Sequence, residues 1–260
     1  MCWWSPGAID WGWPAGRFPE TAIASLSGGA DRLRESAKVR LEEIVADLRD
    51  THPELDVRDV LLGEQPARAL SGFVTKVDAA MLVIGPPGEN LLSRMVFGST
   101  ATELTRVPAR PVVVVRGSQD PSVSRGPVIV GLDRASGNGA VLEFALEFAL
   151  EFAQRHTAPV HVVHALGDRG FGHLRRRAAD REAIMAELTE WSGAYPDVPF
   201  EHVVVEDRPE RALLACASRA ALLVVGSRSR SSLRRPLSRS VRRVVLHRAA
   251  CSVSVVGTAG

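Results

Sequence analysis

The chain contains an internal repeat, which constrains its fold more than any other feature of the sequence. The segment AAMLVIG, Ala79 to Gly85, recurs as AALLVVG 141 positions further on, where it begins at Ala220. The same offset relates RPVVVV, which begins at Arg110, to CSVSVV, which begins at Cys251. Upstream, VLLGEQPARAL matches VVVEDRPERAL at an offset of 143. Self-similarity at this distance indicates two copies of one domain, and a two-residue change fits a loop or a helix end.

The second copy alternates short β-branched runs with longer segments of helical periodicity. This pattern predicts an α/β fold with a mostly parallel sheet and helices on both faces. The predicted strands are Pro127–Asp133, Pro159–Leu166, Phe200–Glu206, Ala221–Gly226 and Cys251–Val256. The predicted helices are Ala140–Arg155, Leu174–Trp191, Pro209–Ala220 and Ser240–Arg248.

The first copy has no counterpart of the first strand and the first helix. Counting back from Gly85 gives a strand over Asp56–Leu62 and a helix over Asp31–Arg49, and Cys2–Trp4 is the only candidate for a strand before them. We therefore predict a truncated domain over residues 1–116, a Gly-, Ser- and Pro-containing linker over 117–126, and a complete domain over 127–260.

A glycine pattern follows the strand that ends at Gly85. Its spacing is G-x2-G-x9-G-[ST], formed by Gly85, Gly88, Gly98 and Ser99, and it leads into a helix. Glycines let backbone amides approach an anion, and a helix N-terminus adds free N–H groups and a positive dipole end. A P-loop would need a lysine in this segment, and the dinucleotide pattern GxGxxG is absent from it. The pattern therefore favours a phosphate-binding loop of another kind.

This spacing, between LVIG and a Val-rich strand, resembles the universal stress protein family, as do RPVVVV and VIVGLD. The resemblance covers nearly the whole chain from about Asp31 onward. It implies two tandem Rossmann-like domains of the adenine-nucleotide-hydrolase-like type, each with a parallel sheet in the order 3-2-1-4-5. The first domain would lack strand 1, the centre of the sheet, because of a shortened reading frame or decay, and two inner strand edges would be exposed.

The resemblance also implies an ATP site, with Mg²⁺, in the first copy. Gly85 and Gly88 would line the phosphates, and Gly98, Ser99 and Thr100 would hold phosphate or ribose. The alternative is purely structural, because Thr100 and the glutamate three residues later also form a capping box.

In the second copy the loop is degraded. Gly226 and Ser240 persist, but Ser229 and Arg239 replace the second and third glycines. We expect this half to have lost ATP binding, unless the arginine supplies charge to an anion instead. The acid expected near the nucleotide exists only as Asp133, so a composite site would require the linker to place Asp133 beside the first loop.

The resemblance implies pairing through the last strands. Val112–Val115 and the CSVSVV run would meet within the chain or in a homodimer, and an unknown protein partner would dock on the module. We also hypothesise that Trp3, Trp4, Trp11 and Trp13 cover the edge left by the missing strand.

Eight arginines surround the degraded loop. Such a cluster can bind nucleic acid or a free anion, but it lacks the aromatic residues that usually stack on bases, so a solvated helix face is favoured. The cluster consists of Arg228, Arg230, Arg234, Arg235, Arg239, Arg242, Arg243 and Arg248.

Two further motifs give weaker signals, and catalytic motifs are absent from the sequence. His161 and His164 lie three apart in a strand, so their side chains point to opposite faces and do not form one metal site. GNGAVL, from Gly137, contains two glycines of a dinucleotide fingerprint and leaves an NAD- or FAD-dependent oxidoreductase as an alternative. No nucleophile elbow, Cys–His pair or carboxylate pair points to a catalytic site.

Composition limits the cellular location and the class of partner that we expect. The net charge is only +2, the three cysteines form no CxxC motif, and the N-terminus lacks the pattern of a signal peptide. We predict a cytoplasmic bacterial stress-response module that binds ATP and acts by ligand-gated association, with no dedicated catalytic site. The rival interpretation is a non-binding scaffold of the same fold.

Overall fold

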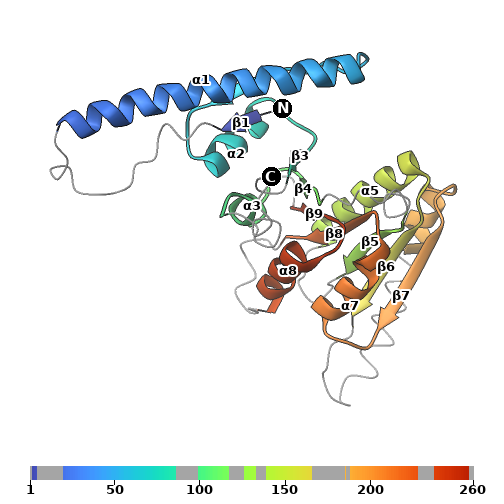
Figure 1. Ribbon diagram of the computed structural model, residues 1–260. Helices are drawn as coiled ribbons and strands as arrows, with labels where there is room; N and C mark the ends of the chain where they lie inside the picture. Colours follow the sequence, from blue (N-terminus) through green and yellow to red (C-terminus); the bar gives the residue numbers. More distant parts are fainter. Residues whose placement is uncertain are drawn as a thin grey trace. The chain divides into compact units, whose positions relative to one another are not determined.

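The computed structural model of the chain describes residues 2–4, 20–85, 99–116, 126–132, 139–165, 185, 188–227 and 237–257. These residues form two compact units, Met1–Val77 and Asp78–Gly260 (Figure 1).

The first unit consists of two short strands and two helices. These are β1 (Cys2–Trp4), α1 (Glu20–Thr51), β2 (Val60–Leu62) and α2 (Pro66–Lys76). β1 and β2 pair in parallel, with Cys2 opposite Val60. The prediction that Cys2–Trp4 is a strand is therefore confirmed, and α1 is longer than the predicted Asp31–Arg49.

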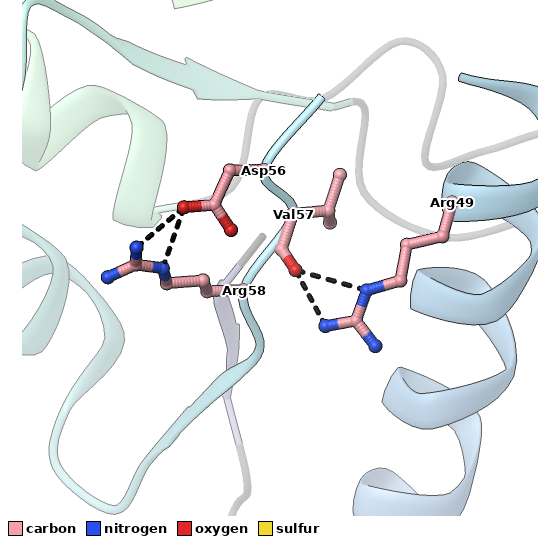
Figure 2. A network of polar contacts seen from close by, with 4 residues as sticks. All are labelled: Arg49, Asp56, Val57 and Arg58. Atoms are coloured by element: carbon pink, nitrogen blue, oxygen red, sulfur yellow. Dashed lines mark hydrogen bonds and ion pairs between the residues drawn. The ribbon is translucent and has the colours of Figure 1, made fainter. Parts of the chain in front are cut away.

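Helix α1 buries one stripe and is joined at its end to the following loop. Ala37, Leu41 and Val45 recur every four residues and are at most 3% exposed, as expected for the apolar face of a surface helix. In the last turn Arg49 donates to the Val57 carbonyl through Nε at 3.2 Å and Nη2 at 2.7 Å (Figure 2). Beside it, the Arg58 guanidinium donates to Asp56 and lowers the pKa of that carboxyl.

The second unit contains a seven-stranded sheet in the order β3-β4-β9-β8-β5-β6-β7. Its strands are β3 (Leu82–Ile84), β4 (Val112–Val114), β5 (Val128–Leu132), β6 (Val160–Ala165), β7 (Phe200–Val205), β8 (Leu222–Gly226) and β9 (Ser252–Val256). Its helices are α3 (Ser99–Leu104), α5 (Gly139–His156), α7 (Pro209–Cys216) and α8 (Leu237–Arg248), with a 3₁₀ turn at Ala217–Arg219. Of the predicted helix Leu174–Trp191, residues 185 and 188–191 are described, and they are helical.

The second copy has the strand order expected for it. β9, β8, β5, β6 and β7 are neighbours in that order and all pair in parallel. Numbered within the copy, this order is 5-4-1-2-3, which is the predicted 3-2-1-4-5 written from the other edge. The predicted fold class, including an order that places the first strand at the centre, is confirmed.

Helices cover both faces of this sheet. Leu146 and Leu150 of α5 are fully buried in one cluster with Val130 and Val162, and Phe144, Phe148 and Phe152 pack at its border. The repeated EFAL segment, Glu143–Ala153, therefore lies in a core-facing helix with alanine and leucine at its most buried positions. On the opposite face, α7 approaches β5 so closely that a Cβ on Gly131 would lie 3.1 Å from the Leu213 side chain.

The two copies meet through their last strands. β4 and β9 pair antiparallel, with Val112 opposite Val255 and Val114 opposite Val253. These four valines are at most 3% exposed. The predicted pairing of the two Val-rich segments within the chain is therefore confirmed, and it forms a buried junction.

The sheet of the first copy is interrupted where its central strand would lie. Among the described residues β3 pairs only with β4, and the side chain of Val83 is 56% exposed. β1 and β2 form their own small sheet in the other unit, so the boundary between the compact units falls after Val77. The linker predicted over residues 117–126 separates the two copies of the repeat, not the two compact units, and it stays a prediction. The tryptophan hypothesis concerns side chains outside the described residues.

Candidate functional site

The strand end that opens the glycine pattern lies where ligands bind in open α/β sheets. Gly85 is the first residue after β3, at its carboxyl end, and α3 begins at Ser99. Gly85 is exposed, and a Cβ built on it would meet nothing within 4 Å. The carboxyl end of β3 is therefore not crowded around the position of the Gly85 Cβ. Gly88 and Gly98 lie outside the described residues, so the glycine pocket stays a prediction.

The hydroxyl residues of the pattern lie in the first turn of α3. The helix begins at Ser99, and Thr100 is its second residue and partly buried. The capping-box alternative needs Thr100 just before the first helical residue, where its side chain would accept an amide. A helix that already includes Thr100 fits that alternative poorly and leaves the amides of this turn facing the loop.

The corresponding helix of the second copy starts earlier. By the repeat, Ser240 corresponds to Ser99, yet α8 begins at Leu237 and so includes Arg239. Arg239, at the position of the third glycine, therefore lies within α8. The loss of the phosphate site in this half stays a prediction. Gly226 ends β8 and is exposed, whereas Asp133 and the Ser240 side chain lie outside the described residues.

A composite site between the copies is excluded by the sheet. β3 is parallel to β4, β4 is antiparallel to β9, and β9 is parallel to β8 and β5. The carboxyl ends of β3 and β5 therefore point in opposite directions. Three strands also separate β3 from β5, a lateral distance of roughly 19 Å at about 4.8 Å per strand. The strand end that precedes Asp133 therefore does not face Gly85.

Two arginines join the copies beside the β4–β9 pair. Arg242 of α8 donates through Nη1 to the Thr105 carbonyl at 2.8 Å and the Arg106 carbonyl at 2.9 Å, at the end of α3. Arg116, after β4, donates to the Leu246 carbonyl, and its partial burial lowers the pKa of its guanidinium. Sequence reasoning placed Arg242 in a solvated cluster and missed Arg116, because both partners are backbone carbonyls far away in the chain.

The structure describes the side chains of only two other arginines of the cluster. Arg243 and Arg248 are exposed on α8, as the solvated-face interpretation expects. Arg228, Arg230, Arg234 and Arg235, and the side chain of Arg239, lie outside the described residues.

The histidines of β6 point to opposite faces, as predicted. His161 Nε2 lies 3.5 Å from Glu201 Oε2, whereas the rings of His164 and His202 stack at 6.3 Å between centroids. The sequence did not reveal His202, since its pairing with His164 depends on the register of β6 and β7. Within the described part of the chain, no group of three or more His, Cys, Asp or Glu is placed to hold a metal ion.

The cysteines whose side chains are described, Cys216 and Cys251, form no disulfide. Burial raises the pKa of Cys251 to about 11 and also raises the pKa of Cys216. Both thiols therefore stay protonated at neutral pH, the unreactive form. Within the described residues no helix combines the length and apolar character that a membrane crossing requires.

Together these features define a tandem α/β protein. Its second copy has a parallel sheet in the order 3-2-1-4-5, its first copy carries the glycine-bearing strand end, and the copies share one sheet through their last strands.

Comparison with known proteins identifies the family. The sequence model of the universal stress protein family matches residues 13–116 and 125–257. A universal stress protein of Mycobacterium tuberculosis is 32% identical over 255 residues, which cover 94% of this chain and 82% of that protein. This chain belongs to the universal stress protein family.

Solved structures agree on the fold. A universal stress protein of Pseudomonas aeruginosa, assigned to the family provisionally in its own description, aligns with a TM-score of 0.63 and 16% identity over 84% of this chain and 78% of that chain. A universal stress protein of Archaeoglobus fulgidus in complex with dAMP aligns with a TM-score of only 0.36 and 22% identity, over 50% of this chain and 96% of that chain. A TM-score that low supports no inference about ligands in this chain.

Proposed function

We propose that this chain is an adenine-nucleotide-binding stress-response module, with ATP bound in the Gly85–Thr100 loop of the first copy. The observation that carries the proposal is the position of Gly85, exposed and uncrowded at the carboxyl end of β3, with α3 beginning at Ser99. A nucleotide phosphate placed there would meet backbone amides from both the strand end and the helix start. The sequence spacing G-x2-G-x9-G-[ST] supports the same assignment.

The described residues at this end of the sheet fit a phosphate better than a reacting centre. They supply amides and the Thr100 hydroxyl, and Mg²⁺ would enter together with the phosphates. ATP would order the loop and shift the chain toward the conformation that a partner protein recognises. The function is therefore ligand-gated association, without a dedicated catalytic group. We keep a cytoplasmic location as a prediction from the dispersed cysteines.

Nucleotide release tests this proposal. Purified protein is denatured, and the supernatant is assayed for adenine nucleotide by chromatography. The wild type is expected to release it, and Gly98→Arg is expected to release none, since a long side chain would fill the point where backbone meets phosphate. Gly63→Arg is the matched control, because a Cβ on Gly63 also meets nothing within 4 Å and Gly63 lies in another loop. Equal release from all three proteins would contradict the proposal.

The rival is a scaffold of the same fold that binds no nucleotide. The buried β4–β9 junction favours it, since association through last strands needs no ligand. Folded protein with no released nucleotide and no thermal shift in ATP would support this rival. A flavin spectrum, or a thermal shift with NAD that is lost on changing Gly137, would instead support the oxidoreductase alternative.

A further inference from the structure

A pocket lies at the junction of the two copies, and its lining includes cationic side chains. It has a volume of about 350 Å³ and lies between α3 and α8. The residues that line it are Thr102, Thr105, Arg242, Arg243, Val244, Leu246 and His247. Among the described lining residues there is no carboxylate, while two guanidinium groups and one imidazole are present.

The repeat explains why space remains there. Equivalent strands pair antiparallel, so an approximate two-fold axis relates the copies and brings the equivalent helices α3 and α8 together. At the offset of 141, Ala101 and Thr102 correspond to Arg242 and Arg243. Long basic side chains therefore come from one helix only. The small residues of the other helix leave the pocket open and add no competing charge.

Two arginines at this junction are held in place by the fold. Arg242 is oriented by its two bonds to the Thr105 and Arg106 carbonyls, and Arg116 is anchored on the Leu246 carbonyl. A positioned guanidinium loses less conformational freedom on binding an anion than a free one. Burial, and then the charges of Arg243 and Arg116, lower the pKa of His247, so the imidazole senses a positive potential.

We propose that this pocket binds an oxyanion of the phosphate class, through Arg243 and His247 with Arg242 and Thr102 at its sides. None of the described residues that line this pocket belongs to the Gly85–Thr100 segment. It makes the arginine-rich helix of the second copy an anion sensor at the junction, where binding would tighten the contact between α3 and α8.

Calorimetry with inorganic pyrophosphate at low ionic strength tests the proposal, since added salt screens such contacts. Wild type is expected to bind with a saturable isotherm. Arg243→Gln is expected to bind at least about tenfold more weakly, as for loss of a charge-assisted hydrogen bond. Arg248→Gln is the matched control, because Arg248 is exposed on the same helix but does not line the pocket. Circular dichroism checks that each variant is folded.

Further measurements show whether the bound phosphate is free or part of a nucleotide, and whether it lies beside His247. Gly98→Arg should bind pyrophosphate as the wild type does, so failure of the nucleotide proposal leaves this one intact. If Arg243→Gln weakens ADP binding as much as it weakens pyrophosphate binding, the phosphate that the pocket binds can be the diphosphate of a nucleotide. In histidine NMR spectra, saturating pyrophosphate should raise the pKa of His247. No saturable binding, equal loss in Arg248→Gln, or an unchanged His247 signal would overturn the proposal.

Discussion

Strands β3 and β8 have nearly the same sequence, yet they lie in opposite environments. Val83 is 56% exposed, whereas its counterpart Val224 is fully buried, and Met81 is 39% exposed where Leu222 is 2% exposed. β8 has β5 on one edge and β9 on the other, while β3 pairs with β4 alone among the described strands. An apolar run therefore predicts a strand, but the neighbours of that strand decide how far it is buried.

The largest expected effect comes from placing a charge in each strand. Val224→Asp should lower the free energy of unfolding by about 4 kcal/mol or more, because an unpaired carboxylate would lie in the core. Val83→Asp should change it by no more than about 0.5 kcal/mol, as at other exposed positions. Urea unfolding followed by circular dichroism measures both. Equal losses would mean that a further segment covers β3.

Glycines near the strand ends give the next contrast. A Cβ on Gly257, after β9, would lie 2.2 Å from the Pro108 carbonyl oxygen, so Gly257→Ala should destabilise the junction by about 2 kcal/mol. Gly85→Ala, after β3, meets nothing within 4 Å and should leave thermal stability unchanged in nucleotide-free protein. A tolerated Gly257→Ala would show that the copies separate easily.

A buried thiol distinguishes the copies at high pH. Burial raises the pKa of Cys251 from 9.0 to about 11, whereas the first copy has the ion-paired Arg110 at this position. Between pH 9 and pH 11 the unfolded chain loses this proton first, so the free energy of unfolding should fall as pH rises, by roughly 3 kcal/mol in total. Below pH 9 both states keep the proton and the effect vanishes. Cys251→Ala should remove this part of the slope in urea unfolding across that range; an unaltered slope would mean that the thiol is accessible.

The smallest effect is expected at the contact between α3 and α8. Arg242→Ala should destabilise the second unit by about 1 kcal/mol, since two backbone carbonyls lose a charged donor. Arg248→Ala, on the exposed side of the same helix, should stay within about 0.5 kcal/mol. Thermal unfolding of the two variants side by side measures the difference. If the order is reversed, Arg242 does not join the copies.

Much of the candidate site could be predicted from local sequence. The strand just before Gly85 and the helix that begins at Ser99 follow from a β-branched run, a glycine pattern and a helical period, all of which act over a few residues. The early start of α8 could not be predicted, because a degraded glycine pattern does not show where a helix will begin. The partners of Arg242 and Arg116 were also hidden, since each is a carbonyl about 130 residues away in the chain.

Sequence patterns alone predicted the two copies and their strand and helix segments, whereas the strand order of the second copy and the pairing of the Val-rich last strands came from the family resemblance. A repeat and its apolar runs specify which segments become strands, because side-chain size and branching act locally. The tertiary structure was needed to show that the carboxyl ends of the strands point in opposite directions in the two copies. It was also needed to show that small residues of α3 and basic residues of α8 line one pocket. Both outcomes follow from the antiparallel direction in which β4 meets β9, a relation between distant segments that no local pattern encodes.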